Sequence, residues 1–258
     1  MAAPLCLCLA GPNGSGKSTA SALPREYCPP DRWIDPDQVA EQLRLTSGQR
    51  ELTEDVSREA FEAARIRRCR LAADFEDFGF ETVFSHGSNL AFLRALRSVG
   101  YEVHLWFVCT EHVDINVARV ASRVEQNGHS VPEEKIRARY GRSLQLLSLA
   151  VRELDRVILF DNSDAAKANG RRLTAGRLVA EIAGSSGGQA PEFVSVFPPI
   201  PFWVLANGLF PLTPGWSATQ VGRNTLARFE GELHFDPRVP GKPLEEFFLQ
   251  VQRLPPRR

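Results

Sequence analysis

The sequence lacks an excess of either charge, because its 31 Lys and Arg residues are balanced by 31 Asp and Glu residues. A domain that holds DNA or RNA by neutralising many phosphates usually carries a net basic surface, so this composition argues against nucleic acid as a partner. Lysine is scarce, with 4 Lys against 27 Arg, and each lysine is therefore informative. The chain has 258 residues, which is enough to bury a core without disulfides or structural metal ions.

Cysteine is also scarce, and the five cysteines present lack the paired spacings of a zinc site. Two of them, Cys6 and Cys8, lie in an apolar run, where thiols usually pack as small hydrophobic side chains. Because disulfides are rare in reducing compartments, we predict a reduced, cytoplasmic protein.

Long apolar runs are missing as well. No Lys or Arg precedes the short apolar stretch 5–10, so we expect no signal peptide. Only residues 193–210 approach the length of a membrane span, and Pro198, Pro199 and Pro201 make that segment unsuitable as a helix. We therefore expect no membrane partner.

What the sequence does contain is an alternation of apolar, strand-like runs and segments with helical periodicity. The expected strands are 5–10, 32–34, 80–84, 103–109 and 156–160, and the expected helices are 17–24, 37–44, 54–78, 88–99, 111–126 and 131–151. This alternation predicts an α/β fold of three layers, with a mostly parallel five-stranded sheet between helices. The periodicity of residues 173–182 supports either a final strand or a short helix.

The composition changes after Gly184. Residues 185–189 form a Gly/Ser linker, and a tract rich in proline and aromatic residues follows at 193–214. We therefore divide the chain into a domain at 1–184 and a C-terminal extension of unknown structure at 185–258. A packed extension is the simpler expectation, and a surface for a partner protein is the alternative.

The strongest motif begins where the first expected strand ends. The sequence Gly11-Pro12-Asn13-Gly14-Ser15-Gly16-Lys17-Ser18 matches the phosphate-binding pattern G-x-x-x-x-G-K-[ST] between a strand and a helix. Backbone N–H groups of such a loop converge on phosphate oxygens, the lysine reaches the β- and γ-phosphates, and the hydroxyl of Ser18 is a ligand for Mg²⁺. With Thr19 included, residues 11–19 predict a P-loop domain that binds ATP or GTP with Mg²⁺.

The same loop sequence also occurs in ABC-type ATPases. The core of their signature sequence is similar to Ser186-Gly187-Gly188-Gln189 of this chain. An ABC domain needs an apolar strand that ends in Asp-Glu shortly after the signature. Residues 190–201 contain four prolines and no acid after Glu192. A linker is therefore the favoured interpretation of 185–189.

Acidic residues mark the ends of two expected strands, where reactive side chains gather beside the phosphate loop in such a sheet. Asp35 and Asp37 follow the strand 32–34, and Asp37 could serve either in catalysis or as the N-cap of the next helix. Glu81 lies inside an expected strand, where burial without a partner is costly, so a functional role is favoured.

The motifs together resemble the zeta toxin family, and more narrowly its short bacterial branch. The resemblance rests on the loop 11–18, the turn 34–37, the strand residues 80–82, and the segments 126–132 and 139–144, in the family's order over about residues 4–165. It implies kinase activity that transfers a phosphoryl group from ATP or GTP to a hydroxyl group. In the best-known members the acceptor is the sugar 3′-hydroxyl of UDP-N-acetylglucosamine, and an antitoxin protein is an implied partner.

The resemblance also implies roles for individual residues. Asp37 would be the general base, Lys17 would contact the transferred phosphate, and Asp35, Glu81 and Thr82 would hold the acceptor. After Glu81 the sequence departs from the family, because toxin-like members have small residues and an Arg there, whereas this chain continues with Val83, Phe84, Ser85, His86 and Gly87, and His86 stands near the position of that Arg. We count Ser85 and His86 as acceptor-binding candidates and infer a different or weaker sugar-nucleotide site.

Arginines from a lid usually neutralise the charge that spreads over the γ-phosphate. The apolar stripe of helix 111–126 places Arg123 nearer its packed face than Arg119, and the family resemblance also favours Arg123 as the catalytic, phosphate-contacting residue. On helix 131–151 the same reasoning favours Arg137 and Arg139, with a solvated basic face as the alternative. The polar residues 161–163 follow the last expected strand, either near the adenine or, as we favour, in a turn.

Two further functions stay open at the level of sequence. A kinase for another small molecule, such as NAD, a nucleoside or an antibiotic, shares every motif described above. A nucleotide-gated ATPase module of the ABC kind would hydrolyse ATP without labelling an acceptor.

Overall fold

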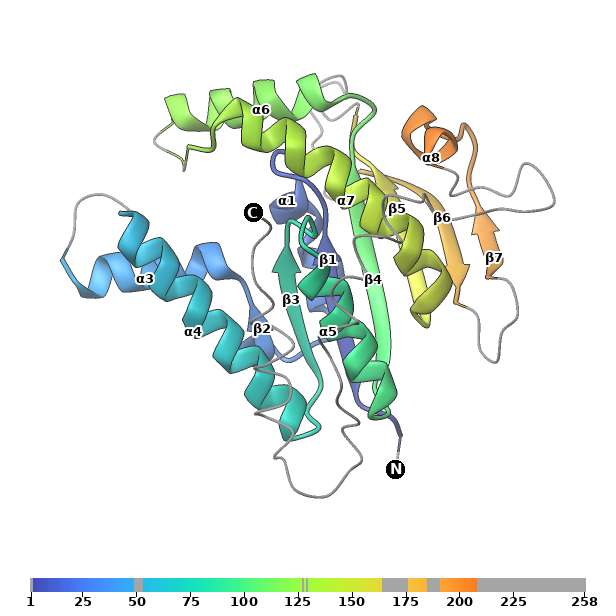
Figure 1. The fold of residues 1–258 in the computed structure, drawn as a ribbon, viewed down its shortest axis with the longest axis horizontal. Coiled ribbons are helices and arrows are strands. Elements are labelled where there is room, and N and C mark those ends of the chain that lie inside the picture. Colours follow the sequence, from blue (N-terminus) through green and yellow to red (C-terminus); the bar gives the residue numbers. More distant parts are fainter. Residues whose placement is uncertain are drawn as a thin grey trace.

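The computed structural model describes residues 2–48, 53–126, 128, 130–163, 176–184 and 191–207 (Figure 1). The strands are β1 (Leu5–Ala10), β2 (Trp33–Ile34), β3 (Phe78–Thr82), β4 (Glu102–Cys109), β5 (Arg156–Asp161), β6 (Arg177–Ala183) and β7 (Glu192–Val196). The α-helices are α1 (Lys17–Ala20), α2 (Ala22–Arg25), α3 (Pro36–Thr46), α4 (Glu54–Ala73), α5 (Gly87–Ser98), α6 (Val113–Glu125), α7 (Glu133–Glu153) and α8 (Phe202–Ala206). The proposed ABC-like signature at 186–189 lies outside the described residues.

All these strands form one sheet in the order β2-β3-β1-β4-β5-β6-β7. The first five pair in parallel, which confirms the predicted α/β fold with a mostly parallel sheet. The expectation of five strands was wrong, because β6 and β7 add two antiparallel strands beyond β5. Parallel strands are buried on both faces and read as continuous apolar runs, whereas these two antiparallel strands are partly exposed and give a weaker signal.

The periodicity of residues 173–182 supported either a strand or a short helix. In the structure this region contains strand β6, from Arg177 to Ala183. Strand β7 and helix α8 lie within the predicted C-terminal extension. Because β7 pairs with β6 and Trp203 of α8 is buried in the main core, residues 191–207 pack on the same sheet. Residues 208–258 lie outside the described part of the chain.

Helix α4 and strand β3 are offset from their expected positions. The helix ends at Ala73 rather than at 78, and Phe75 then adopts a left-handed φ of 55°, which a helix cannot continue. The strand accordingly runs from Phe78 to Thr82, and Phe84 leaves it with a φ of 56°. This shift places Glu81 one residue from the carboxyl end of the strand.

Two apolar clusters cover the two faces of the sheet. Side chains alternate along β1, so that Cys6, Cys8 and Ala10 belong to the larger cluster, which includes residues of α4, α5 and α7. Leu7 and Leu9 point to the other face, where the smaller cluster includes Ala20 of α1. None of the helices in the described part of the chain is both long and apolar enough to cross a lipid bilayer.

Candidate functional site

The phosphate-binding loop joins β1 to α1 and has the conformation that its glycines permit. Gly16 has a φ of 95°, in the left-handed region that favours glycine, and it directly precedes the first residue of α1. A Cβ at Gly16 would collide with the amide nitrogen of Asn162. The loop therefore needs glycine here both for its backbone conformation and for close contact with the end of β5.

Two asparagines from outside the motif hold this loop. The side-chain amide of Asn116, on α6, donates to the carbonyl oxygen of Asn13 at 2.7 Å. The amide of Asn162, just beyond β5, donates to the carbonyl oxygen of Ser15 at 2.8 Å. Both side chains are buried, so these bonds fix the loop in place. Asn116 was not among the predicted site residues, and its only signal in the sequence is that a polar residue lies within the apolar stripe of α6.

Lys17 turns its ammonium group back onto the loop, where it donates to the carbonyl oxygens of Gly11 at 2.8 Å and Pro12 at 3.2 Å. Burial lowers the pKa of Lys17, and Glu81, Asp37 and Asp35 act against that shift by their negative charge. The predicted lysine and all three predicted acids are thus close enough to interact electrostatically.

The two aspartates of the turn 34–37 have different roles. Asp35 is the N-cap of α3, and its side chain accepts a hydrogen bond from the backbone N–H of Asp37 at 3.0 Å. The N-cap interpretation of Asp37 was wrong, because Asp37 lies in the first turn of the helix, after Pro36, and is exposed. Its carboxylate is therefore not committed to capping this helix.

Glu81 is the most perturbed acid of the site. It lies opposite Leu9 of β1, is 7% exposed, and its Oε1 is 3.4 Å from the guanidinium of Arg25. The same guanidinium is 3.7 Å from Asp35. Burial, helped by the charge of Asp35, raises the pKa of Glu81 to about 7, although Lys17 and Arg25 oppose the shift. The sequence offered no signal for Arg25, which comes from α2.

The raised pKa of Glu81 predicts how stability depends on pH. The folded protein keeps a proton on Glu81 at pH values where the unfolded chain has already released it. The free energy of unfolding of the wild type therefore falls as the pH rises through this range. Relative to the wild type, Glu81→Gln should gain about 2 kcal/mol in free energy of unfolding between pH 5 and pH 8. Urea unfolding at the two pH values measures this gain.

Glu41→Gln is the matched control for this change. The exposed carboxylate of Glu41 accepts hydrogen bonds from Arg44, which lower its pKa, so it stays ionised between pH 5 and pH 8. The control should therefore show no gain over this range. An equal gain in both variants would contradict the assignment to Glu81.

The other predicted acceptor-binding residues follow Glu81 at the turn into α5. Thr82 accepts a hydrogen bond on its hydroxyl from the N–H of Phe84 at 3.1 Å. His86 is the N-cap of α5, with its Nδ1 accepting from the N–H of Ser88 at 3.3 Å. The carbonyl oxygen of Ser85 accepts from Arg142 of α7 at 3.2 Å. The three residues thus lie in one turn at the carboxyl end of β3, and their contact with an acceptor stays a prediction.

The predicted order of the α6 arginines was wrong. Arg119 is half-buried and donates to the carbonyl oxygen of Asn162 at 2.7 Å and of Gly14 at 3.5 Å, whereas Arg123 is exposed. Arg123 is nevertheless close enough to Lys17 to lower its pKa. The contact of Arg123 with phosphate stays a prediction. Arg119, which the helical periodicity predicted to point toward solvent, instead contacts the phosphate loop.

The two α7 arginines separate clearly. Arg139 is half-buried and donates to the side-chain oxygen of Asn13, in the loop, at 3.1 Å. Burial lowers the pKa of Arg139, and the neighbouring Arg142 adds to this shift. Arg137 is exposed and forms ion pairs with Asp114 and Glu133. Of these two α7 arginines, Arg139 contacts the loop and Arg137 pairs with acids on α6 and α7.

This difference predicts unequal effects on nucleotide affinity. Arg139→Ala should weaken ATP binding about tenfold or more, because it removes a partly buried cation that contacts the loop. Arg137→Ala should change the affinity less than about twofold, because exposed ion pairs contribute little. Calorimetric titration of both variants with ATP makes the comparison, and equal effects would argue that α7 presents its arginines in another way.

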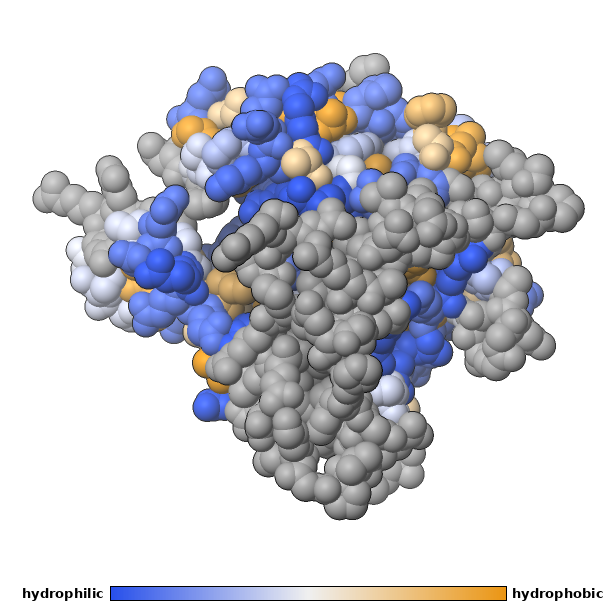
Figure 2. Space-filling view, in the orientation of Figure 1, coloured by the Kyte–Doolittle hydropathy of each residue, from blue (hydrophilic) through white to orange (hydrophobic). Residues whose placement is uncertain are grey.

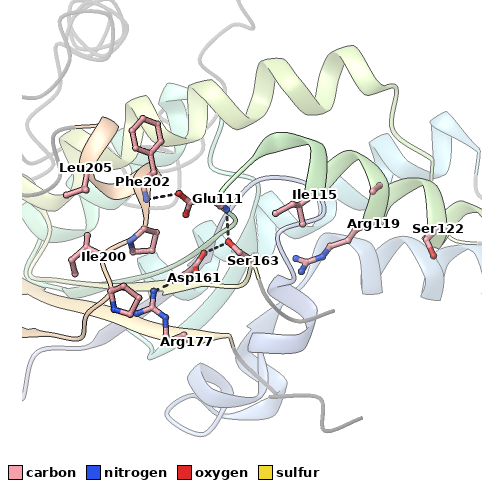
Figure 3. Close-up of a pocket in the computed structure, with 13 residues that line it drawn as sticks. Glu111, Ile115, Arg119, Ser122, Asp161, Ser163, Arg177, Ile200, Phe202 and Leu205 are labelled. Atoms are coloured by element: carbon pink, nitrogen blue, oxygen red, sulfur yellow. Dashed lines mark hydrogen bonds and ion pairs between the residues drawn. The ribbon is translucent and has the colours of Figure 1, made fainter. Parts of the chain in front are cut away.

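A pocket of about 910 Å³ lies between α6, the end of β5 and α8 (Figure 3). Ile115 and Arg119 of α6 line one side, and Ile200, Phe202 and Leu205 line the other. Polar residues around the end of β5 lie between these two sides, and they include Asp161, Ser163 and Arg177. Asn162, favoured as a turn residue, supports the loop at this point.

The chain is similar to known proteins in sequence and in fold. The model of the zeta toxin family matches residues 1–173. A Haemophilus influenzae protein, described only as uncharacterized, is 30% identical over 132 residues, which are 50% of this chain and 88% of that protein. The crystal structure of AvrRxo1-ORF1:-ORF2 with ATP has 14% identity and a TM-score of 0.57, covering 98% of this chain and 81% of that chain. That likeness concerns the fold.

Proposed function

Because this chain belongs to the zeta toxin family, a membership that supports ATP-dependent kinase activity, we propose that it phosphorylates a small molecule. The proposed acceptor is a hydroxyl group of a nucleotide sugar similar to UDP-N-acetylglucosamine, or of a similar small metabolite. One observation carries the proposal. Lys17 of the phosphate loop lies within electrostatic reach of Asp37 and Glu81, which come from two neighbouring strand ends. A phosphate donor on the loop and a hydroxyl acceptor at the acids would therefore meet at Lys17.

The loop and its neighbours would bind the donor. Backbone N–H groups of residues 11–19 would hold the phosphates, with Lys17 at the β- and γ-phosphates. The hydroxyl of Ser18, an exposed residue, and the carboxylates that interact with Lys17 are oxygen ligands of the kind that suits Mg²⁺. The described residues include no group of three or more His, Cys, Asp and Glu that could hold a metal, so phosphate oxygens would complete the coordination. When bound, Mg²⁺ would neutralise charge on the phosphates.

Asp37 would act on the acceptor. Phosphoryl transfer needs positioning and charge stabilisation more than covalent chemistry, together with one carboxylate that takes the proton of the attacking hydroxyl. Asp37 suits this role because its carboxylate is exposed and uncommitted to the cap of α3. Asp35, Glu81 and Thr82, with Ser85 and His86 in the following turn, would hold the acceptor.

Arginines would stabilise the transferred group. Arg139 contacts the loop, and Arg123 is close enough to Lys17 to affect its pKa. Both cations would offset the negative charge that develops on the γ-phosphate. An antitoxin protein is a proposed partner, as the family resemblance implies.

The test is a search for a labelled product. Purified protein is incubated with γ-labelled ATP and Mg²⁺, separately with UDP-N-acetylglucosamine, related nucleotide sugars and NAD, and with Asp37→Asn alongside. We expect one nucleotide sugar to become heavier by one phosphate with the wild type only. A labelled product from NAD alone would redirect the proposal to another acceptor. Label released only as free phosphate, equally by both proteins, would contradict it.

A further inference from the structure

One wall of the pocket beside the phosphate loop comes from beyond the family match. The match ends at residue 173, whereas Ile200, Phe202 and Leu205 line the pocket opposite α6 (Figure 3). These three residues belong to α8 and the turn before it, a segment that the sequence analysis assigned to the C-terminal extension. The segment therefore lies beyond the residues that the family model matches.

The segment is anchored to the main domain at both polar and apolar points. The backbone N–H of Phe202 donates to Oε1 of Glu111 at 2.8 Å, and the indole N–H of Trp203 donates to Asp161 at 3.4 Å. Trp203 and Val204 are buried in the larger core, with the Trp203 ring 6.3 Å from that of Phe107. These contacts hold α8 beside the ends of β4 and β5.

The same short helix leaves two large apolar side chains exposed. Phe202 is 64% exposed and Leu205 is 36% exposed, and hydrophobic residues reach the surface at the position of α8 in Figure 2. Both residues line the pocket. Large apolar side chains that are held rigidly at the rim of a pocket mark a surface that another apolar group can cover.

Arg119 connects this pocket to the phosphate loop. It lines the pocket, and its guanidinium donates to the carbonyl oxygens of Gly14 and Asn162. We propose that the pocket receives the base of the donor nucleotide and that Phe202 and Leu205 form the wall on which the base packs. This inference rests on the proposed function only in taking the phosphate loop as the site of the donor phosphates.

The chemistry of the pocket fits a flat, largely apolar group. Its polar side chains already have partners within the protein: the hydroxyl of Ser163 donates to Asp161 at 2.6 Å and accepts from the backbone N–H of Glu111 at 2.7 Å. Arg177 donates to the carbonyl oxygen of Phe197 at 2.9 Å. Ile115, Ile200, Phe202 and Leu205 therefore supply most of the contact surface that remains, and a nucleotide base has two flat faces to bury against it.

The experiment compares a ligand that has a base with one that lacks it. Phe202→Ala and Leu205→Ala are titrated calorimetrically with ATP and with inorganic tripolyphosphate, both with Mg²⁺. Each variant should bind ATP about tenfold more weakly, because a large apolar contact is lost. Affinity for tripolyphosphate should stay within about twofold of the wild type, because only the loop holds it.

Phe197→Ala is the matched control. Phe197 is 44% exposed and precedes the same segment, but it does not line the pocket, so its replacement should leave both affinities unchanged. Unchanged ATP affinity in Phe202→Ala and Leu205→Ala would overturn the proposal. An equal loss for both ligands would also overturn it, because the segment would then support the loop instead.

The outcome is independent of the acceptor. If the wild type labels an acceptor but the two variants bind ATP normally, the base pocket is refuted and the proposed kinase function stands. If ATP binding depends on Phe202 and Leu205 but no acceptor is labelled, the pocket is supported and the proposed function fails. Thermal unfolding of each variant verifies that the fold is intact.

Discussion

Asp37→Asn should lower the rate of phosphoryl transfer about 10²–10⁴-fold, the usual contribution of a general base. The amide keeps the size of the side chain but cannot take the proton of the attacking hydroxyl. ATP affinity should change little, because Asp35 rather than Asp37 caps α3 and the substitution leaves the loop contacts in place. The measurement is kcat and KM with the acceptor that the labelling experiment identifies.

Asp55→Asn provides a control at an equivalent position. Asp55 lies in the first turn of α4 as Asp37 does in α3, each two residues after its N-cap, and its side chain is 83% exposed. The control therefore removes the same charge from the same place in a helix, with the same small loss of interaction with the helix dipole. Asp55→Asn should keep full turnover. Similar turnover by both variants would remove Asp37 from its proposed role.

Gly11→Ala should both destabilise the protein and abolish nucleotide binding. Gly11 is buried with a φ of 150°, and a Cβ there would collide with the carbonyl oxygen of Val108 in β4 and approach the Ser15 hydroxyl to 2.8 Å. Since β4 is a central strand of the sheet, backbone on both sides would have to shift. We expect a loss of about 2–5 kcal/mol in the free energy of unfolding. Urea unfolding and ATP titration measure the two effects.

The matched control is Gly141→Ala in α7. A Cβ at Gly141 has no neighbour within 4 Å, and the residue is exposed within a helix. Alanine should stabilise that helix by roughly 0.5–1 kcal/mol, because it loses less backbone entropy than glycine on folding. If Gly11→Ala unfolded at the same urea concentration as the control, the close approach of the loop to β4 would be contradicted.

The helical periodicity of α6 illustrates where sequence reasoning failed. The apolar stripe of this helix consists of Val113, Val117, Val120 and Val124, and it predicts that all four are on the buried face. In the structure Val124 is 38% exposed, whereas the polar Asn116 is fully buried. The helix is turned so that Asn116 and Arg119 reach the phosphate loop and the end of β5. Hydrogen bonds to this loop, rather than apolar contact alone, set which face of α6 is inward.

The sequence by itself determined the features that depend on neighbouring residues. The phosphate loop, the five parallel strands and the turn with Asp35 and Asp37 are each encoded within a short stretch, because glycine conformation, apolar runs and helix capping are local effects. The edge strands β6 and β7 were not determined in this way, since partly exposed antiparallel strands have a mixed polar and apolar pattern.

Only the tertiary structure decided which distant groups surround the loop. Arg25 pairs with Glu81 across 56 residues, Asn116 reaches Asn13 across 103, and Asn162 reaches Ser15 across 147. Such contacts follow from the order of strands in the sheet, which brings the carboxyl ends of β1, β3 and β5 to one edge. The raised pKa of Glu81 likewise results from burial between packed elements, because no short stretch of sequence specifies how completely a carboxyl is removed from water.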